Sequence, residues 1–263
     1  MRKFVGLSAA MVFSEFAFGG LAFAADMAVK APPPPVAAPA YSWSGFYIGG
    51  SVGDAWSRNG ASQGQLFGGP GLTASPLLPF DTNGSAAIGG PQVGYNWQFA
   101  PQWVAGIESD FAWTKLNGSQ TYNPIPPGGA GVAAPPSFMT MSRDVEWLGS
   151  VRGRLGYTWN RALLYFTGGA AWSRTDFTGI ESRAGGAAGE TASFSSTKAG
   201  WVAGGGLEYM LSNNWSGRVQ YLYYSFAGAS TVVPGILTSF DTFAWGRTQV
   251  SSLTVGLNYK FGN

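Results

Sequence analysis

The chain has 263 residues, a formal net charge of +2, no Cys, no His, 40 Gly and 15% aromatic residues. The missing Cys and His exclude disulfides, iron–sulfur clusters, thiol nucleophiles, the usual zinc sites and the commonest general base. Only 11% of the residues are charged, against about 25% in ordinary globular domains. No basic block suggests a nucleic-acid partner, and the aromatic content is too high for a disordered chain.

The N-terminus has the pattern of a secretory signal peptide. Two basic residues at positions 2 and 3 precede an apolar stretch that ends in Ala-Phe-Ala. This pattern predicts a signal peptide over residues 1–24, cleaved between Ala24 and Ala25. An uncleaved membrane anchor is the alternative, and Glu15 inside the apolar stretch disfavours it.

A Pro-rich segment follows the predicted cleavage site. It contains four consecutive prolines, which favour a polyproline II conformation and cannot propagate a helix. We expect residues 25–42 to form a periplasmic spacer ahead of a barrel domain over residues 43–263. The alternative is a docking segment for a periplasmic partner.

Residues from 43 onward alternate between apolar and small or polar side chains, which is the period of a strand with two different faces. In the last such segment Leu253, Val255 and Leu257 share one face, whereas Ser252 and Thr254 lie on the other. Eight segments show the pattern: 43–56, 92–99, 103–113, 145–157, 162–174, 199–211, 215–223 and 252–261.

The connections between these segments alternate in length. Short connections fall near 100–102, 160–161 and 212–214, and long ones rich in Gly, Pro, Ser and Thr fall at about 57–85, 117–142, 177–196 and 227–246. An even number of strands with short turns on one side is the plan of a bacterial outer-membrane barrel. The sequence therefore predicts an all-β, eight-stranded antiparallel up-and-down transmembrane barrel with four long extracellular loops and both mature termini in the periplasm. A β-sandwich with an aromatic core is the alternative, and it explains neither the low charge nor the alternating loop lengths.

The aromatic residues favour a membrane barrel over a soluble one. Many Trp and Tyr residues lie near the predicted strand ends, where interfacial girdles require amphipathic rings. They include Trp97, Trp103, Trp113, Trp147, Tyr157, Trp159, Trp172, Trp201, Tyr209, Trp215 and Tyr259.

The charged residues of the strands share the polar face, which would point into the lumen. A charge in a narrow lumen loses water and must be paired. We therefore predict an ion-pair network that fills the lumen, without assigning individual partners. The alternative is an ion path in which Arg152 and Arg154 exchange between acidic partners. The predicted network comprises Glu108, Asp110, Glu146, Arg152, Arg154, Lys198, Glu208, Arg218 and Lys260.

Several motifs resemble those of a known family. The chain contains Trp-Ser-Gly-Phe-Tyr-Ile-Gly-Gly at 43–50, Arg-Gly-Arg-Leu-Gly-Tyr at 152–157 and Thr-Gly-Gly-Ala-Ala at 167–171. In this order they resemble the small outer-membrane β-barrel proteins of alphaproteobacteria, the RopB-like porin-family surface antigens, which in turn resemble the opacity and OmpA-type barrels. The resemblance implies an integral outer-membrane protein that contributes to envelope integrity and surface contacts and carries no catalytic residues. It also implies that Phe261, although followed by two more residues, is the terminal strand signal that the barrel assembly machinery recognises.

The leading functional hypothesis is a structural, surface-exposed barrel among outer-membrane lipids and lipopolysaccharide. The long loops could meet a host surface and the spacer could meet peptidoglycan, but the residues indicate no particular receptor. The second hypothesis is a porin or small-solute channel, although water-filled pores usually need about 16 strands. An adhesin with a specific receptor is a further alternative.

An enzyme is the least favoured reading of the sequence. The known outer-membrane barrel enzymes resemble one another in relying on a His, which this chain lacks. A metal ion is also not expected, because the acidic loop residues Asp81, Asp176, Glu181 and Glu190 lack calcium-loop spacing. The sequence therefore predicts no enzymatic activity, no cofactor and no metal.

Overall fold

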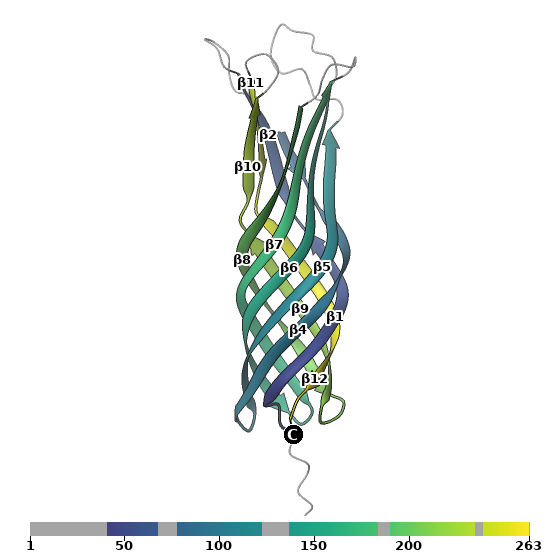
Figure 1. The fold of residues 1–263 in the computed structure, drawn as a ribbon, viewed down its shortest axis with the longest axis vertical. Helices are drawn as coiled ribbons and strands as arrows, with labels where there is room; N and C mark the ends of the chain where they lie inside the picture. Colours follow the sequence, from purple (N-terminus) through teal and green to yellow (C-terminus); the bar gives the residue numbers. More distant parts are fainter. Residues whose placement is uncertain (1–40, 68–77, 123–136, 184–189, 235–238, 263) are drawn as a thin grey trace, which may run out of the picture. The chain divides into compact units, whose positions relative to one another are not determined.

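The computed structural model describes residues 41–67, 78–122, 137–183, 190–234 and 239–262. The predicted signal peptide, its cleavage site and most of the Pro-rich spacer lie outside the described residues. Eight antiparallel strands close into a barrel in the order β1-β12-β9-β8-β7-β6-β5-β4 (Figure 1), which confirms the predicted fold class. The barrel strands are β1 (Gly45–Ser57), β4 (Gly84–Ala100), β5 (Trp103–Tyr122), β6 (Ser137–Trp159), β7 (Ala162–Arg183), β8 (Glu190–Met210), β9 (Trp215–Phe226) and β12 (Thr248–Lys260).

The segments predicted to be long loops contain much more strand than expected. β5 and β6 continue into both ends of the second predicted loop, and β7 and β8 continue into both ends of the third. The first and fourth predicted loops contain four further strands, which form a separate sheet in the order β10-β11-β2-β3. These strands are β2 (Gly60–Phe67), β3 (Leu78–Asp81), β10 (Ala229–Pro234) and β11 (Ser239–Trp245). The prediction of loops was wrong here because Gly, Ser and Thr are poor indicators of a strand when its partner is distant in sequence. Within the described residues, no helix is long and apolar enough to span a membrane.

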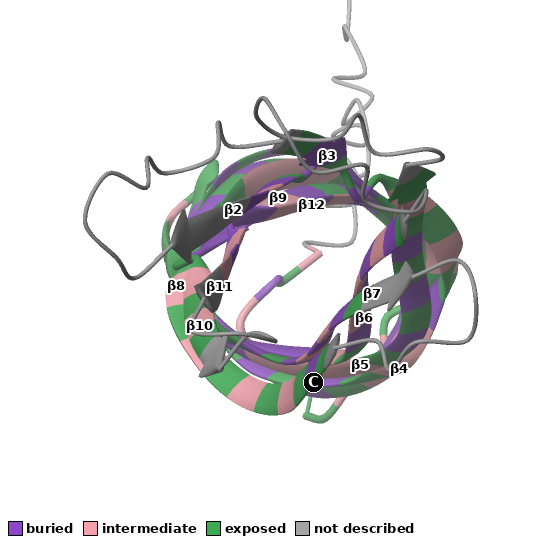
Figure 2. Ribbon diagram, turned by 90° about the horizontal axis from the view of Figure 1, so that it is seen from above, coloured by how far each residue is buried: buried purple, intermediate pink, exposed green. Residues whose placement is uncertain are grey.

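The strands follow the predicted alternation of faces. Figure 2 shows buried and exposed positions alternating around the ring. Phe166 on β7 and Val52 on β1 are 73% and 64% exposed, whereas Tyr165 is 1% exposed. The turn between β6 and β7 is tight, and Asn160 adopts a φ of 52°, a left-handed conformation that Asn tolerates better than most residues.

Aromatic rings form two belts on the outer surface. At the short-turn end, the pairs Trp103–Tyr157, Trp215–Tyr259 and Phe46–Phe261 have ring centroids 5.5, 5.2 and 5.9 Å apart. Towards the other end, Phe111–Trp147 and Trp201–Tyr223 are 5.2 and 5.5 Å apart. Along β5 the belts are separated by about ten residues, or roughly 25 Å along the barrel axis for a strand tilted by about 45°. This matches the height of the apolar band of outer-membrane barrels, about 25 Å.

The second sheet encloses an apolar core of its own against the extensions of β6 to β8. Met141 on β6, Phe177 on β7 and Phe243 on β11 are fully buried in it, together with Trp245. Phe177 and Trp245 have ring centroids 5.3 Å apart. Two sheets that pack apolar faces together stabilise each other, so this extension is a folded layer beyond the aromatic belts.

Arg143 lies where this extension meets the barrel. It is 1% exposed, and its guanidinium donates to the carbonyl oxygens of Gly246, Arg247 and Gly60 at 3.2, 3.4 and 3.4 Å. It also lies 5.6 Å from the centre of the Phe177 ring. No acidic residue of the described chain forms an ion pair with it, and burial lowers its pKa to about 10. Arg143 thus binds the two chain segments that connect β2 and β11 of the second sheet to the barrel strands β1 and β12.

Candidate functional site in the barrel lumen

The lumen contains an ion-pair network centred on Glu108 of β5. Its Oε1 atom accepts from Arg152 of β6, the residue directly opposite it in the strand pairing. Its Oε2 atom accepts from Arg218 at 2.6 Å and from the Tyr47 hydroxyl at 2.5 Å, and it lies 3.5 Å from Nη1 of Arg154. One carboxylate therefore faces three guanidinium groups that come from two strands.

Two further carboxylates complete the network. Glu208 on β8 accepts from Arg154 at 2.8 Å, Ser216 at 2.5 Å and Asn258 at 2.8 Å. Asp110 lies 2.9 Å from Arg152 and accepts from the Ser150 hydroxyl. The three acids match the three arginines, so the cluster is formally neutral. Such balance is required because an unpaired charge in a dehydrated lumen costs several kcal/mol.

Two buried tyrosines orient Arg154. Its guanidinium carbon lies 4.0 Å from the centre of the Tyr165 ring and 5.8 Å from that of Tyr47, within the range of cation–π attraction. Two glycines make room for these rings: a Cβ at Gly94 would overlap the Tyr47 hydroxyl, and one at Gly206 would lie 2.6 Å from the Tyr165 hydroxyl. Part of the high glycine content thus reflects large side chains that fill the lumen.

The structure does not place all the predicted network residues together. Glu108, Asp110, Arg152, Arg154, Glu208 and Arg218 form one cluster. Lys198 and Lys260 are half-buried and form no ion pair with any described residue. Lys260 instead donates to the carbonyl oxygen of Ser42 at 2.5 Å.

Glu146 is on the outer surface, so its prediction as a lumen residue was wrong. Its carboxylate pairs with Arg174 at 2.9 Å, and both side chains are about half exposed. The cause is an irregularity in the pairing of β6 between Val145 and Trp147. The extra residue exchanges the two faces of the strand from this point on. Val145 therefore points into the lumen, although its alternation with the neighbouring residues had predicted the outer face.

The sequence-based prediction omitted other members of the network. Tyr47 and Tyr165 were not predicted, although strict alternation from the outward Phe46 and Phe166 would have placed both inside. Gln92, on the polar face of β4, accepts from Arg218 and donates to Asn258 at 2.6 Å. Uncharged groups therefore join the arginines and carboxylates into one connected network.

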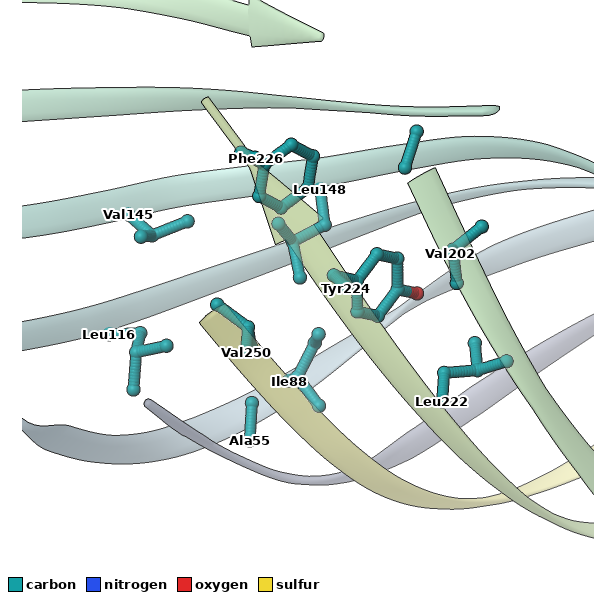
Figure 3. Close-up of a cluster of buried hydrophobic side chains, with 11 residues drawn as sticks. Ala55, Ile88, Leu116, Val145, Leu148, Val202, Leu222, Tyr224, Phe226 and Val250 are labelled. Atoms are coloured by element: carbon teal, nitrogen blue, oxygen red, sulfur yellow. The ribbon is translucent and has the colours of Figure 1, made fainter. Parts of the chain in front are cut away.

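Apolar side chains close the lumen on both sides of the network. Towards the long-loop end, Leu148 on β6 and Leu222, Tyr224 and Phe226 on β9 belong to a buried cluster, shown in Figure 3. Towards the short-turn end, Trp43 packs with Val104, Leu163, Tyr165 and Met210. Two cavities beside the network each have a volume of about 20 Å³, enough for about one water molecule. The described residues contain no group of acidic side chains that could hold a metal ion.

A closed antiparallel barrel with an apolar, aromatic-belted exterior and a polar, filled interior defines a transmembrane β-barrel. The chain belongs to the outer membrane protein beta-barrel domain family, whose model matches residues 21–261.

It is 34% identical over 248 residues to the 31 kDa outer-membrane immunogenic protein of Brucella melitensis, covering 93% of this chain and 95% of that protein. It is 31% identical to the 22 kDa outer membrane protein of Rhizobium leguminosarum, covering 85% of this chain and 80% of the relative. The protein is thus an outer-membrane β-barrel, in agreement with the predicted resemblance and location.

Solved structures with similar folds include Ail of Yersinia pestis, with 16% identity and a TM-score of 0.32 over 81% of this chain and 99% of that chain. Neisserial surface protein A has 13% identity and a TM-score of 0.38, over 83% and 98%. The outer membrane protease OmpT of Escherichia coli has 10% identity and a TM-score of 0.47, over 82% and 97%.

Proposed function

We propose that this protein is a structural, non-conducting barrel that carries a folded two-sheet layer on the outside of the cell. The observation that supports this most strongly is the filling of the lumen. An ion-pair network and two apolar layers follow one another along the axis, and the two cavities beside the network each have a volume of only about 20 Å³. Ion conduction would require both apolar layers to move.

The test is conductance in planar lipid bilayers. Insertion is verified on the same preparation by the shift in gel mobility between boiled and unboiled samples. We expect inserted protein to give no steady current. A large, steady single-channel conductance would contradict the proposal and support the alternative, a porin.

The proposed orientation places the short turns and both ends of the barrel domain in the periplasm. The support is that β1 begins and β12 ends at the short-turn side, whereas β5 to β8 extend far beyond the aromatic belt on the other side, as in outer-membrane barrels generally. The chain has no Cys, so single cysteines test this directly. With an impermeant maleimide on intact cells, Ser230→Cys on β10 should be labelled and Ser212→Cys in a short turn should not. The reverse result would invert the orientation.

The proposed partners are outer-membrane lipids, lipopolysaccharide and the barrel assembly machinery. Phe261 is the proposed terminal signal because it continues the last strand: its backbone N–H donates to Phe46 at 2.8 Å, and its ring lies against Tyr259 and Phe46. Phe261→Ala should lower the amount of heat-modifiable protein in the outer membrane, whereas Phe99→Ala, an equally exposed ring on β4, should have little effect. The proposal includes no catalysis, since the sequence offers neither His nor Cys.

A further inference from the structure

The segment just before β1, Tyr41–Ser44, lies across the short-turn mouth of the barrel, and we call it the crossbar. Figure 2 shows a short stretch of described chain crossing the opening that the strands enclose. Trp43 is only 2% exposed, and it packs with Val104, Leu163, Tyr165 and Met210 from the surrounding strands. An indole in this position covers the end of the lumen.

Polar contacts attach the crossbar to several sides of the mouth. The side chain of Gln98 on β4 accepts from the Trp43 backbone N–H at 2.9 Å, and the Gln98 N–H donates to the Ser44 hydroxyl at 2.9 Å. Lys260 at the end of β12 donates to the Ser42 carbonyl oxygen at 2.5 Å. Arg161, in the turn between β6 and β7, donates to the Tyr41 hydroxyl and lies 4.6 Å from the centre of its ring. The crossbar is therefore attached to β4, the β6–β7 turn and β12.

The crossbar lies next to the ion-pair network. Trp43 packs in the same cluster as Tyr165, the ring that lies over Arg154. The cavity of about 20 Å³ at this end is lined by Trp43, Asn96 and Glu208, among others. Asn96 Oδ1 and Trp43 Nε1 are buried without a hydrogen-bond partner in the described chain. This cavity, which turn residues such as Asn214 also line, borders the indole, and loss of the indole would open it further to bulk water.

The crossbar is not part of the barrel sheet. Pairing of β1 with β4 begins at Gly45 and with β12 at Tyr47, so residues 41–44 are held by side-chain contacts and single hydrogen bonds. Gly45 has a φ of 142°, and a Cβ there would lie 3.0 Å from the Phe261 carbonyl oxygen. Gly45 thus allows the sharp change of direction between strand and crossbar.

We propose that the crossbar is a detachable seal, with Gly45 as its hinge and Trp43 as its stopper, that keeps water at this mouth away from the ion-pair network. Detachment breaks no bond between barrel strands, so the seal can open while the barrel stays closed. Residues 25–40 precede Tyr41 in the predicted mature chain, so a force on this upstream segment would act directly on the crossbar. This goes beyond the proposed non-conducting role, because it concerns water at one end of the lumen rather than ion flow through it.

The Cys-free sequence permits an accessibility test in purified, lipid-reconstituted protein. Asn96→Cys places a thiol under the indole, and Ser173→Cys, a fully buried position on β7, places a control thiol on the far side of the network. Labelling rates with a small charged thiosulfonate are compared with and without Trp43→Ala. Removal of a buried indole should raise the rate at position 96 by at least about tenfold and leave position 173 unchanged.

Two results would overturn the proposal. No change at position 96 would show that Trp43 does not seal the mouth, and an equal rise at both positions would show that it only stabilises the whole barrel. If Trp43→Ala does not fold, Gln98→Ala replaces it. This variant removes one hydrogen bond to the crossbar and should raise labelling at position 96 alone by about two- to tenfold. An unchanged rate there would also reject the seal. None of these outcomes alters the conductance test.

Discussion

The sharpest prediction concerns Glu108, the carboxylate at the centre of the ion-pair network. Glu108→Gln keeps the shape of the side chain but removes the charge that three arginines share. The remaining acids, Asp110 and Glu208, then face Arg152, Arg154 and Arg218 with one positive charge in excess. Removing one partner of a buried ion pair costs about 3–5 kcal/mol. Because Glu108 contacts all three arginines, the loss should fall at the upper end of that range.

Glu146→Gln is the matched control. It is the same chemical change on a neighbouring strand, but the Glu146–Arg174 pair is about half exposed, and exposed pairs contribute about 0–1 kcal/mol. The assay is urea unfolding in lipid vesicles, followed by tryptophan fluorescence and the boiled-versus-unboiled gel shift. Glu108→Gln should lower the free energy of unfolding several kcal/mol more than Glu146→Gln does.

A double variant tests the charge balance itself. Glu108→Gln with Arg218→Gln leaves two acids and two arginines, so its loss should be smaller than the sum of the two single losses. Strict additivity, or a Glu108→Gln loss no greater than that of Glu146→Gln, would refute the view that the network behaves as one balanced cluster.

Three other predictions concern packing, the extracellular layer and pH. Gly94→Ala should cost about 1–3 kcal/mol through overpacking, whereas Gly153→Ala, with no atom nearer than 4.0 Å to the new Cβ, should be tolerated; equal unfolding midpoints would contradict this. Arg143→Met should leave the gel shift intact but speed proteolysis of the layer beyond the belts, and an unchanged cleavage rate would contradict the assigned anchoring role. Asp144 and Asp176 face each other across β6 and β7, and burial together with that neighbouring charge raises the pKa of Asp144. Since a raised pKa means that the folded state binds the proton more tightly, stability should rise as pH falls through the Asp144 titration. Asp176→Asn should reduce this rise and stabilise the protein at pH 7, and unfolding midpoints measured across pH would detect a failure of either effect.

The alternation of side chains was sufficient to predict the barrel and most of its faces. Strands that separate lipid from a polar lumen must alternate with a period of two, and this constraint acts on each residue locally. For this reason Phe166, Val52 and Leu253 could be assigned outward, and Arg152, Arg154 and Glu208 could be selected as lumen residues, before any partner was known.

Ion-pair partners could not be predicted, because they depend on the register between strands and on distances across the lumen. Arg218 and Glu108 are 110 positions apart in the chain, and nothing local relates them. The extra sheet was missed for the same reason: β2 pairs with β11, and neither segment shows a strong strand pattern alone.

Single-residue irregularities in the strand pairing could also not be predicted from the sequence. One extra residue at Glu146 moved that carboxylate outside and Val145 inside, because a shift of one position exchanges the two faces of a strand. The crossbar depended on contacts with β4, the β6–β7 turn and β12 together. Sequence alone determined the barrel and, outside such irregularities, which residues meet lipid and which meet the lumen. Only the tertiary structure decided which lumen residues meet one another and how the mouth is closed, because those contacts join strands that are distant along the chain.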